Sequence, residues 1–205
     1  MNGIKDIFSR GLAIIFCAAL LSTASMPAVA LAPAPEERMG IAGPIKFGDE
    51  SYRLAWTSHP SPVFYKQEYL TAGQSPERYD SMLMIDFIAS GTTVAESAQA
   101  MVHSLEARKE NDPLVNYDMI VSEAGDQIIL DFVLSAAGAD GQMILEWNAY
   151  RYSVQGSGVR MVGISRRVYG DDVAPFLKNE LRTVRARDID LLSKLTLPAI
   201  RIAAP

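Results

Sequence analysis

The sequence predicts an α+β domain: a curved antiparallel sheet of about six to seven strands with two main helices packed on it. Three observations support this fold class. A long β-rich hairpin spans Gln142–Tyr169 around a glycine-rich turn. A capping box, Thr93 followed by Glu96, begins an amphipathic helix. The order of elements is three strands, a helix, four strands and a helix, which is typical of an antiparallel sheet covered by helices.

The first thirty residues have the pattern of a secretory signal peptide. Lys5 and Arg10 form a basic start, Gly11–Leu21 is apolar, and Ala28–Ala30 is a small-residue cleavage site. Because this apolar run is well below the ~20 residues that span a bilayer, we expect cleavage after Ala30 rather than a membrane anchor. Cleavage after Ala32 is the less favoured alternative, since a proline would follow it. We therefore expect a periplasmic or secreted protein of a Gram-negative bacterium.

Composition excludes several kinds of site. Cys17 is the only cysteine and lies in the predicted signal peptide, so the mature chain has no disulfide, thiolate nucleophile or cysteine metal site. The formal net charge of −5 argues against nucleic-acid binding, which needs a concentrated positive surface. No later apolar run is long enough for a transmembrane span, so none is expected after signal cleavage.

One folded domain is expected after the signal peptide. We expect residues 31–44 to be a proline-containing linker, residues 45–190 a single α+β domain, and residues 191–205 a C-terminal tail. Apolar alternation and the turn-forming residues between the runs define the strands. The first three strands are expected at residues 52–57, 63–70 and 81–88, and the last four at 117–123, 127–135, 142–154 and 159–169.

Two helices complete the predicted fold. The first is expected over residues 93–110, where apolar residues repeat at helical spacing after the capping box. The second is expected over residues 171–187, with an aspartate as its N-cap. Residues 189–195 either extend this helix or form a short further turn.

Side chains alternate along the first arm of the hairpin, so its two faces differ in character. The polar and aromatic face carries Glu146, Asn148, Tyr150 and Tyr152, and the face expected in the core carries Met143, Leu145, Trp147 and Ala149. A turn at Gln155–Gly158 pairs Val154 with Val159. This register places Tyr150 opposite Gly163, which leaves room for the ring, and Glu146 opposite Arg167.

The order of elements over roughly residues 45–188 resembles the fold of PsbP, the extrinsic photosystem protein, and its non-photosynthetic relatives. This resemblance rests on element order and implies a curved antiparallel sheet flanked by helices. The stretches Tyr65–Tyr69, Glu77–Asp80 and Glu146–Tyr152 are also similar to uncharacterised secreted or periplasmic bacterial proteins. That similarity implies a location and no activity.

The sequence contains no familiar catalytic or metal-binding motif. His59 lies in a proline-rich turn and His103 on the polar side of a helix, and no His-Glu-x-x-His spacing exists. Ser165 is expected in the middle of a strand, without the second glycine of a nucleophile elbow. We therefore expect no catalytic residue of a familiar class, no metal and no cofactor.

Two sets of residues are candidates for a site. The first would form a shallow aromatic and polar groove on the sheet, for which the alternative is a solvated sheet face with cross-strand pairs. This set is Tyr65, Tyr69, Glu146, Asn148, Tyr150 and Tyr152. The second set interrupts apolar strands with charges that are costly to bury unless they are paired. These residues are Asp86, Asp131, Arg151 and Arg166, with Lys66 and Arg167 as further possible partners.

Binding is the function that these features favour. The protein would then be an exported, non-enzymatic domain that binds an unidentified envelope protein or a small ligand. One alternative is a carboxylate-dependent hydrolase that uses Asp86, Asp131 and Glu146. Such an enzyme needs two carboxylates about 5–10 Å apart. Another alternative is a structural role in envelope assembly.

Overall fold

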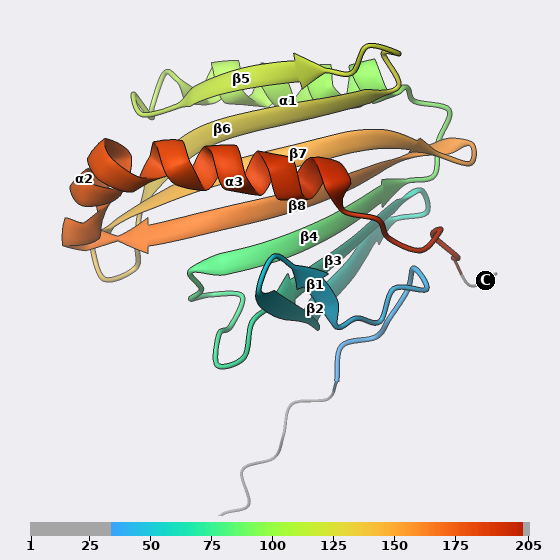
Figure 1. Cartoon of the computed structure of the whole chain (residues 1–205), viewed down its shortest axis with the longest axis horizontal. Helices are drawn as coiled ribbons and strands as arrows, with labels where there is room; N and C mark the ends of the chain where they lie inside the picture. The colour runs from blue at the N-terminus through green and yellow to red at the C-terminus, as the bar shows by residue number, and fades with distance from the viewer. Residues whose placement is uncertain (1–33, 203–205) are drawn as a thin grey trace, which may run out of the picture. The chain divides into compact units, whose positions relative to one another are not determined.

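An eight-stranded antiparallel sheet, with helices on both of its faces, forms the centre of the computed structural model (Figure 1). The structure describes residues 34–202. The strands lie in the order β1-β2-β3-β4-β8-β7-β6-β5, so β1 and β5 are the two edges. Their bounds are β1 Ile45–Phe47, β2 Glu50–Ser61, β3 Phe64–Leu70, β4 Ser81–Ile88, β5 Asn116–Val121, β6 Gln127–Ala137, β7 Met143–Gln155 and β8 Gly158–Tyr169.

The predicted number of strands, six to seven, is wrong because it leaves out the short edge strand β1. This strand has three residues, too few for an alternating pattern to reveal it. Strand β2 also continues through Pro60 to Ser61, where a break was expected. Since β1 pairs with β2 only as far as Tyr52, Pro60 removes no hydrogen bond to that neighbour.

The helices begin where local sequence signals place them. Helix α1 spans Val94–Arg108, and the predicted capping box is confirmed: the Thr93 hydroxyl accepts from the Glu96 N–H, and the Glu96 carboxylate accepts from the Thr93 N–H. The second helical segment is longer than predicted, so residues 189–194 extend it. It comprises η1 Gly170–Asp172, α2 Val173–Pro175, the π-helical turn η2 Phe176–Glu180, and α3 Leu181–Lys194.

The register predicted for the long hairpin is confirmed. Val154 pairs with Val159, Tyr150 with Gly163, and Glu146 with Arg167. Because side chains alternate, this register assigns each residue of β7 to one face of the sheet. We term the face that carries Leu145 and Trp147 the α3 face, and the opposite one the α1 face, after the helices that cover them.

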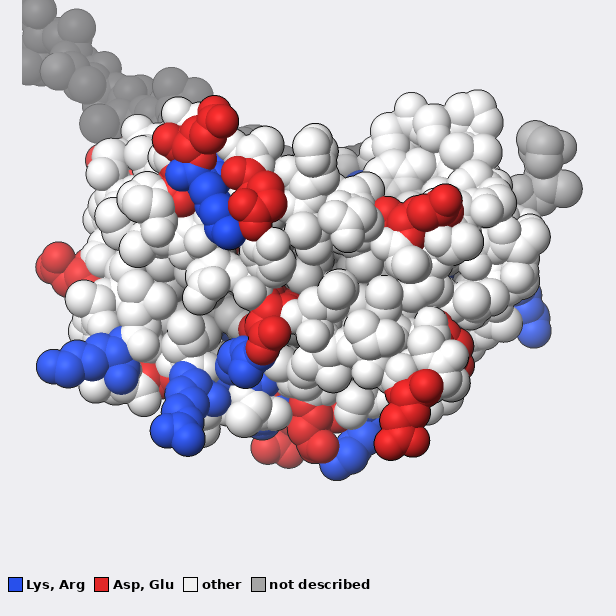
Figure 2. Space-filling model, turned by 90° about the horizontal axis from the view of Figure 1, so that it is seen from above, with Lys and Arg blue, Asp and Glu red and all other residues white. Residues whose placement is uncertain are grey.

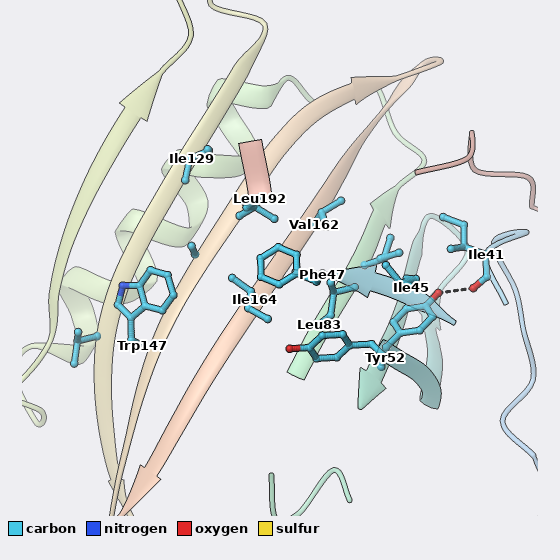
Figure 3. Packing of buried hydrophobic residues seen from close by; sticks show 14 of the residues in the cluster. Ile41, Ile45, Phe47, Tyr52, Leu83, Ile129, Trp147, Val162, Ile164 and Leu192 are labelled. Atoms are coloured by element: carbon cyan, nitrogen blue, oxygen red, sulfur yellow. Dashed lines mark hydrogen bonds between the residues drawn. The ribbon is translucent and has the colours of Figure 1, made fainter. Parts of the chain in front are cut away.

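Each face has its own hydrophobic core. On the α3 face, Trp147, Ile164 and Leu83 pack with Phe47 of β1 and Leu192 of α3 (Figure 3). On the α1 face, Val94, Ala98 and Leu105 of the helix pack against residues of β6, β7 and β8. Leu145 and Trp147 are buried as predicted, but Met143 is 48% exposed, so its prediction as core is wrong. The last pair between β7 and β8 is Ile144 with Tyr169, which leaves Met143 beyond the end of β8.

Both ends of the described chain contribute to the α3-face core. Met39, Ile41 and Leu192 are buried, and the Arg201 N–H donates to the Met39 carbonyl over 2.9 Å. The packed unit is therefore wider than residues 45–190, because parts of the expected linker and tail belong to its core. The predicted signal peptide lies outside the residues that the structure describes.

The surface seen in Figure 2 mixes charges of both signs along its rims around a broad uncharged stretch. This view looks towards the β5 edge, where Met119, Ile120 and Val121 are exposed. Within residues 34–202, every helix is too short or too polar to cross a bilayer.

Candidate functional site

The six residues predicted as a binding groove do not share one surface. Tyr65 and Tyr69 pair with Phe87 and Leu83 of β4 and lie on the α3 face. Tyr69 is fully buried and its hydroxyl donates to the Ile41 carbonyl over 2.6 Å, whereas Tyr65 is half-buried and stacks on His59. The other four residues lie on the opposite, α1 face. A groove made of all six is therefore ruled out.

The tyrosines of the α1 face are core residues. The Tyr150 ring lies against Gly163 and meets Phe132 edge-on, with ring centres 4.9 Å apart. Tyr152 and Asn148 are 6% and 2% exposed. Burial raises the pKa of Tyr150 well above its ordinary value and also raises that of Tyr152. These rings therefore form neither the predicted shallow groove nor its alternative, a solvated sheet face, because α1 covers this part of the sheet.

Glu146 belongs to a network that closes one end of the sheet. It pairs with Arg167 and accepts a 2.8 Å hydrogen bond from the Tyr79 hydroxyl. The Arg167 guanidinium also stacks on the Tyr79 ring, 3.8 Å from its centre. Tyr169 then donates to the Tyr79 carbonyl and accepts from the Tyr79 N–H. These contacts tie the loop before β4 to the hairpin and leave Glu146 with a structural role.

The three acids of the hydrolase hypothesis are not close together. Asp131 lies on the α3 face, where it accepts a 3.2 Å hydrogen bond from the Trp147 indole, while Asp86 lies on the α1 face. Glu146 shares the α1 face with Asp86 but is six residues away from it in register. At about 3.3 Å per residue this separation is about 20 Å, which exceeds the range of a carboxylate pair.

Most charges inside the sheet have partners of opposite sign. Asp86 lies 3.3 Å from Lys66, one of its predicted partners, and Asp131 lies 2.6 Å from Arg185 of α3, which was not among them. Arg166 binds Asp188, which has no exposed surface, and Glu50, each over 2.7 Å. The pairs of Arg185 and Asp188 hold α3 against the sheet, and the pair of Arg166 with Glu50 links β8 to β2.

Arg151 departs from this pattern, and its prediction as an ion-pair residue is wrong. It is 6% exposed, yet its terminal nitrogens donate only to backbone: to the Ser193 carbonyl over 2.9 Å and the Leu195 carbonyl over 2.7 Å. Arg160 on the neighbouring strand donates to the Pro198 carbonyl over 3.3 Å. Among residues 34–202, no carboxylate lies within salt-bridge distance of either guanidinium.

A cavity of about 390 Å³ lies beside these two arginines. Its walls come from β6, β7, β8 and the segment after α3. We term it the arginine cavity, and its polar lining includes Gln127, Arg151, Ser153, Arg160, Lys194 and Asp126. The Nε atoms of both arginines and the Ser153 hydroxyl are buried without a hydrogen-bond partner in the described part of the chain.

The electrostatics of the arginine cavity are unbalanced. Burial lowers the pKa of Arg151, and the nearby charge of Arg160 lowers it further; burial also lowers the pKa of Arg160. Asp126 lines the same cavity, but one of its oxygens accepts a hydrogen bond from Ser122. Lys194 is already paired with Asp190. In the described part of the chain, Asp126 is thus the one acid that lines the cavity, against Arg151, Arg160 and Lys194, and it forms no ion pair with either guanidinium group. The lining therefore carries excess positive charge, which an anion could balance.

A signal for this cavity is present in the sequence. Along β7 the packing face carries Leu145, Trp147 and Ala149 and then changes to Arg151 and Ser153. Across the hairpin, Arg160 pairs with Ser153, so the register brings two basic residues to one face. The acid on the neighbouring strand, Asp131, pairs with Ala149 and lies opposite neither arginine. The cavity itself depends on the segment after α3, whose path no local pattern predicts.

The chain matches a protein family over most of its described length. A model of an uncharacterised bacterial family matches residues 39–197. The match begins at buried Met39 and includes both arginines and the segment that lines the arginine cavity. No curated protein and no solved structure matches the chain.

Proposed function

This chain belongs to the uncharacterised bacterial family that it matches over residues 39–197, and from that premise we propose that it is a non-enzymatic binding domain. Its ligand is a small oxyanion, a carboxylate or a phosphate, held in the arginine cavity. The observation that carries this proposal is the buried Arg151, which has no carboxylate partner among residues 34–202.

The chemistry of the cavity supports an oxyanion. Two guanidinium groups present N–H donors in a planar fork that matches carboxylate and phosphate oxygens. An unpaired charge in a buried position is unfavourable, so a ligand that neutralises it gains more than it would at an exposed site. The free Ser153 hydroxyl adds a neutral donor at the same wall. No part of this arrangement activates a nucleophile or water, so we propose binding without catalysis.

Export completes the proposed role. The signal peptide pattern of residues 1–30 supports a periplasmic or secreted location. The partner would then be a small solute of the envelope rather than a nucleic acid.

Mass spectrometry of the protein recovered from the periplasm should give Leu31 as its first residue. An intact first segment would contradict export with cleavage after Ala30.

Anion binding is tested by titration calorimetry of the mature protein with inorganic phosphate and with acetate. Either anion should bind, and Arg151→Gln and Arg160→Gln should each weaken binding at least tenfold, because each removes one charge from the cavity wall. Arg182→Gln, on the exposed side of α3, is the matched control and should leave binding unchanged. Circular dichroism verifies that each variant is folded. Failure of both anions to bind the folded parent would overturn the proposal.

A further inference from the structure

We propose that the oxyanion carries an apolar chain, so that the ligand is a soluble amphiphile such as a medium-chain carboxylate. This inference rests on the proposed binding of an anion by Arg151 and Arg160. It adds a second cavity, which would hold the chain while the arginine cavity holds the head group.

The second cavity lies next to the first and differs from it in character. Its volume is about 410 Å³, and its walls are residues 40–46 and Leu195–Pro198. Most of these side chains are apolar, including Ile41, Pro44 and Ile45. We term this space the apolar cavity. Each of the two cavities falls in the range of about 300–1,000 Å³ that is usual for small-molecule sites.

One short segment separates the two cavities. Residues Leu195, Thr196 and Leu197 line both of them, on the extended stretch that follows the end of α3. In Figure 1 this stretch passes between the tip of the β7–β8 hairpin and the N-terminal segment. A ligand that crosses it would therefore touch guanidinium groups on one side and apolar side chains on the other.

The same arginines hold this dividing segment in place. Arg151 binds the carbonyls of Ser193 and Leu195, and Arg160 binds that of Pro198. An anion that takes some of these donors weakens the hold on the segment at the point where the chain of the ligand must pass. Binding of the head group and access to the apolar cavity are thus linked through the same nitrogen atoms.

The test is a series of linear carboxylates, from acetate through butanoate and hexanoate to octanoate, measured by calorimetry on the mature protein. Affinity should rise by about fourfold for each methylene that enters the apolar cavity, the fold-change that corresponds to about 0.8 kcal/mol per buried CH₂. Ala42→Asp places a charge in the wall of the apolar cavity and should abolish the gain with chain length. Acetate should still bind to this variant. Ala199→Asp, exposed and outside the lining, is the control.

The outcomes separate this inference from the proposed function. Equal affinity for acetate and octanoate would overturn the inference and leave anion binding intact. A chain-length gain that persists in Arg151→Gln with undiminished affinity would overturn it too, because the head group would not use the arginine cavity. Binding to vesicles of phosphatidylglycerol without binding of free octanoate would also contradict it and indicate a membrane surface instead.

Discussion

The ring of Tyr150 fills the space that a side chain at position 163 would need, so only glycine fits there without a clash. A Cβ atom on Gly163 would be 2.8 Å from Tyr150 Cδ1 and 2.9 Å from Cε1, closer than non-bonded carbon atoms approach each other. The ring cannot move away easily, since it also packs edge-on against Phe132. The glycine is therefore required by close packing across the hairpin.

Gly163→Ala should lower the free energy of unfolding by about 1–3 kcal/mol, the usual effect of overpacking a core. Denaturant unfolding of the parent and the variant measures this difference. Gly91→Ala is the matched control, because a Cβ atom at Gly91 meets nothing within 4 Å. A loss as large for Gly91→Ala as for Gly163→Ala would contradict the packing argument.

Asp86 shows what an imperfectly paired buried charge does to stability. Burial raises the pKa of Asp86, and Lys66 at 3.3 Å only partly offsets this effect. One of its oxygens has no hydrogen-bond partner in residues 34–202. Glu68 on the neighbouring strand also has a raised pKa, through burial. The ionised form of Asp86 is thus less favourable in the folded state than in the unfolded chain.

The sign of the pH dependence follows from linkage. Above the ordinary aspartate value of 3.8, the unfolded chain ionises Asp86 before the folded protein does, so the parent loses stability as pH rises towards the raised pKa. Asp86→Asn removes this loss. The stability of the variant relative to the parent should therefore improve from about pH 4 upwards. Unfolding curves at a series of pH values measure it, and a difference that does not change with pH would contradict the expectation.

At the scale of elements, side-chain hydrogen bonds fix α1 at both ends. Its N-terminus has the Thr93 capping box, and its C-terminus is tied to β6 through Asp112. The buried Asp112 carboxylate accepts hydrogen bonds from the Ser135 N–H over 2.6 Å and the Ser135 hydroxyl over 2.7 Å. Arg108 and the Leu114 N–H donate to it as well. Burial raises the pKa of Asp112, but these hydrogen bonds outweigh burial and lower it overall.

Asp112→Ala should lower the free energy of unfolding by about 2–4 kcal/mol, because it leaves the donors of Ser135 without an acceptor. The depressed pKa of Asp112 adds stability above its ordinary value of 3.8, and this stability is lost as pH falls through the folded-state pKa. The difference between parent and variant should therefore shrink in acid. Asp171→Ala, an exposed aspartate on η1, is the control and should match the parent.

At the edge of the sheet, β5 uses its own side chains to cover free backbone groups. The Asn116 side chain accepts from the Tyr117 N–H over 3.0 Å, and Asp118 accepts from the Met119 N–H over 2.9 Å. Asp118 also pairs with Arg185 of α3. Backbone N–H groups at a sheet edge that already donate to a side chain are less able to pair with a strand of another molecule. This protection offsets the exposed apolar residues of the same strand.

At the scale of the whole molecule, features set by residues close together in the sequence could be predicted, and features set by distant segments could not. The Thr93 capping box and the Tyr150–Gly163 register follow from neighbours in sequence, and both were correct. The partner of Asp131, the burial of Met39 and the walls of the arginine cavity depend on where the last helix and the segment after it lie. Contacts of that range leave no periodic trace, so the walls of the arginine cavity appeared only in the structure. Strand β1 was missed for another reason: its three residues are too few to show an alternating pattern.

The helices on the two faces of the eight-stranded sheet are attached to it differently, and this difference affects how readily each helix opens. Fully buried apolar residues do not favour α3, since it buries Leu192 whereas α1 buries Val94, Ala98 and Leu105. Helix α3 is, however, also held to the sheet by ion pairs of Arg185 with Asp131 and of Arg166 with Asp188. A segment with fewer such attachments opens first in local fluctuations. Backbone amides of α1 should therefore exchange with deuterated solvent before those of α3. Such opening would leave the arginine cavity, on the other side of the sheet, undisturbed.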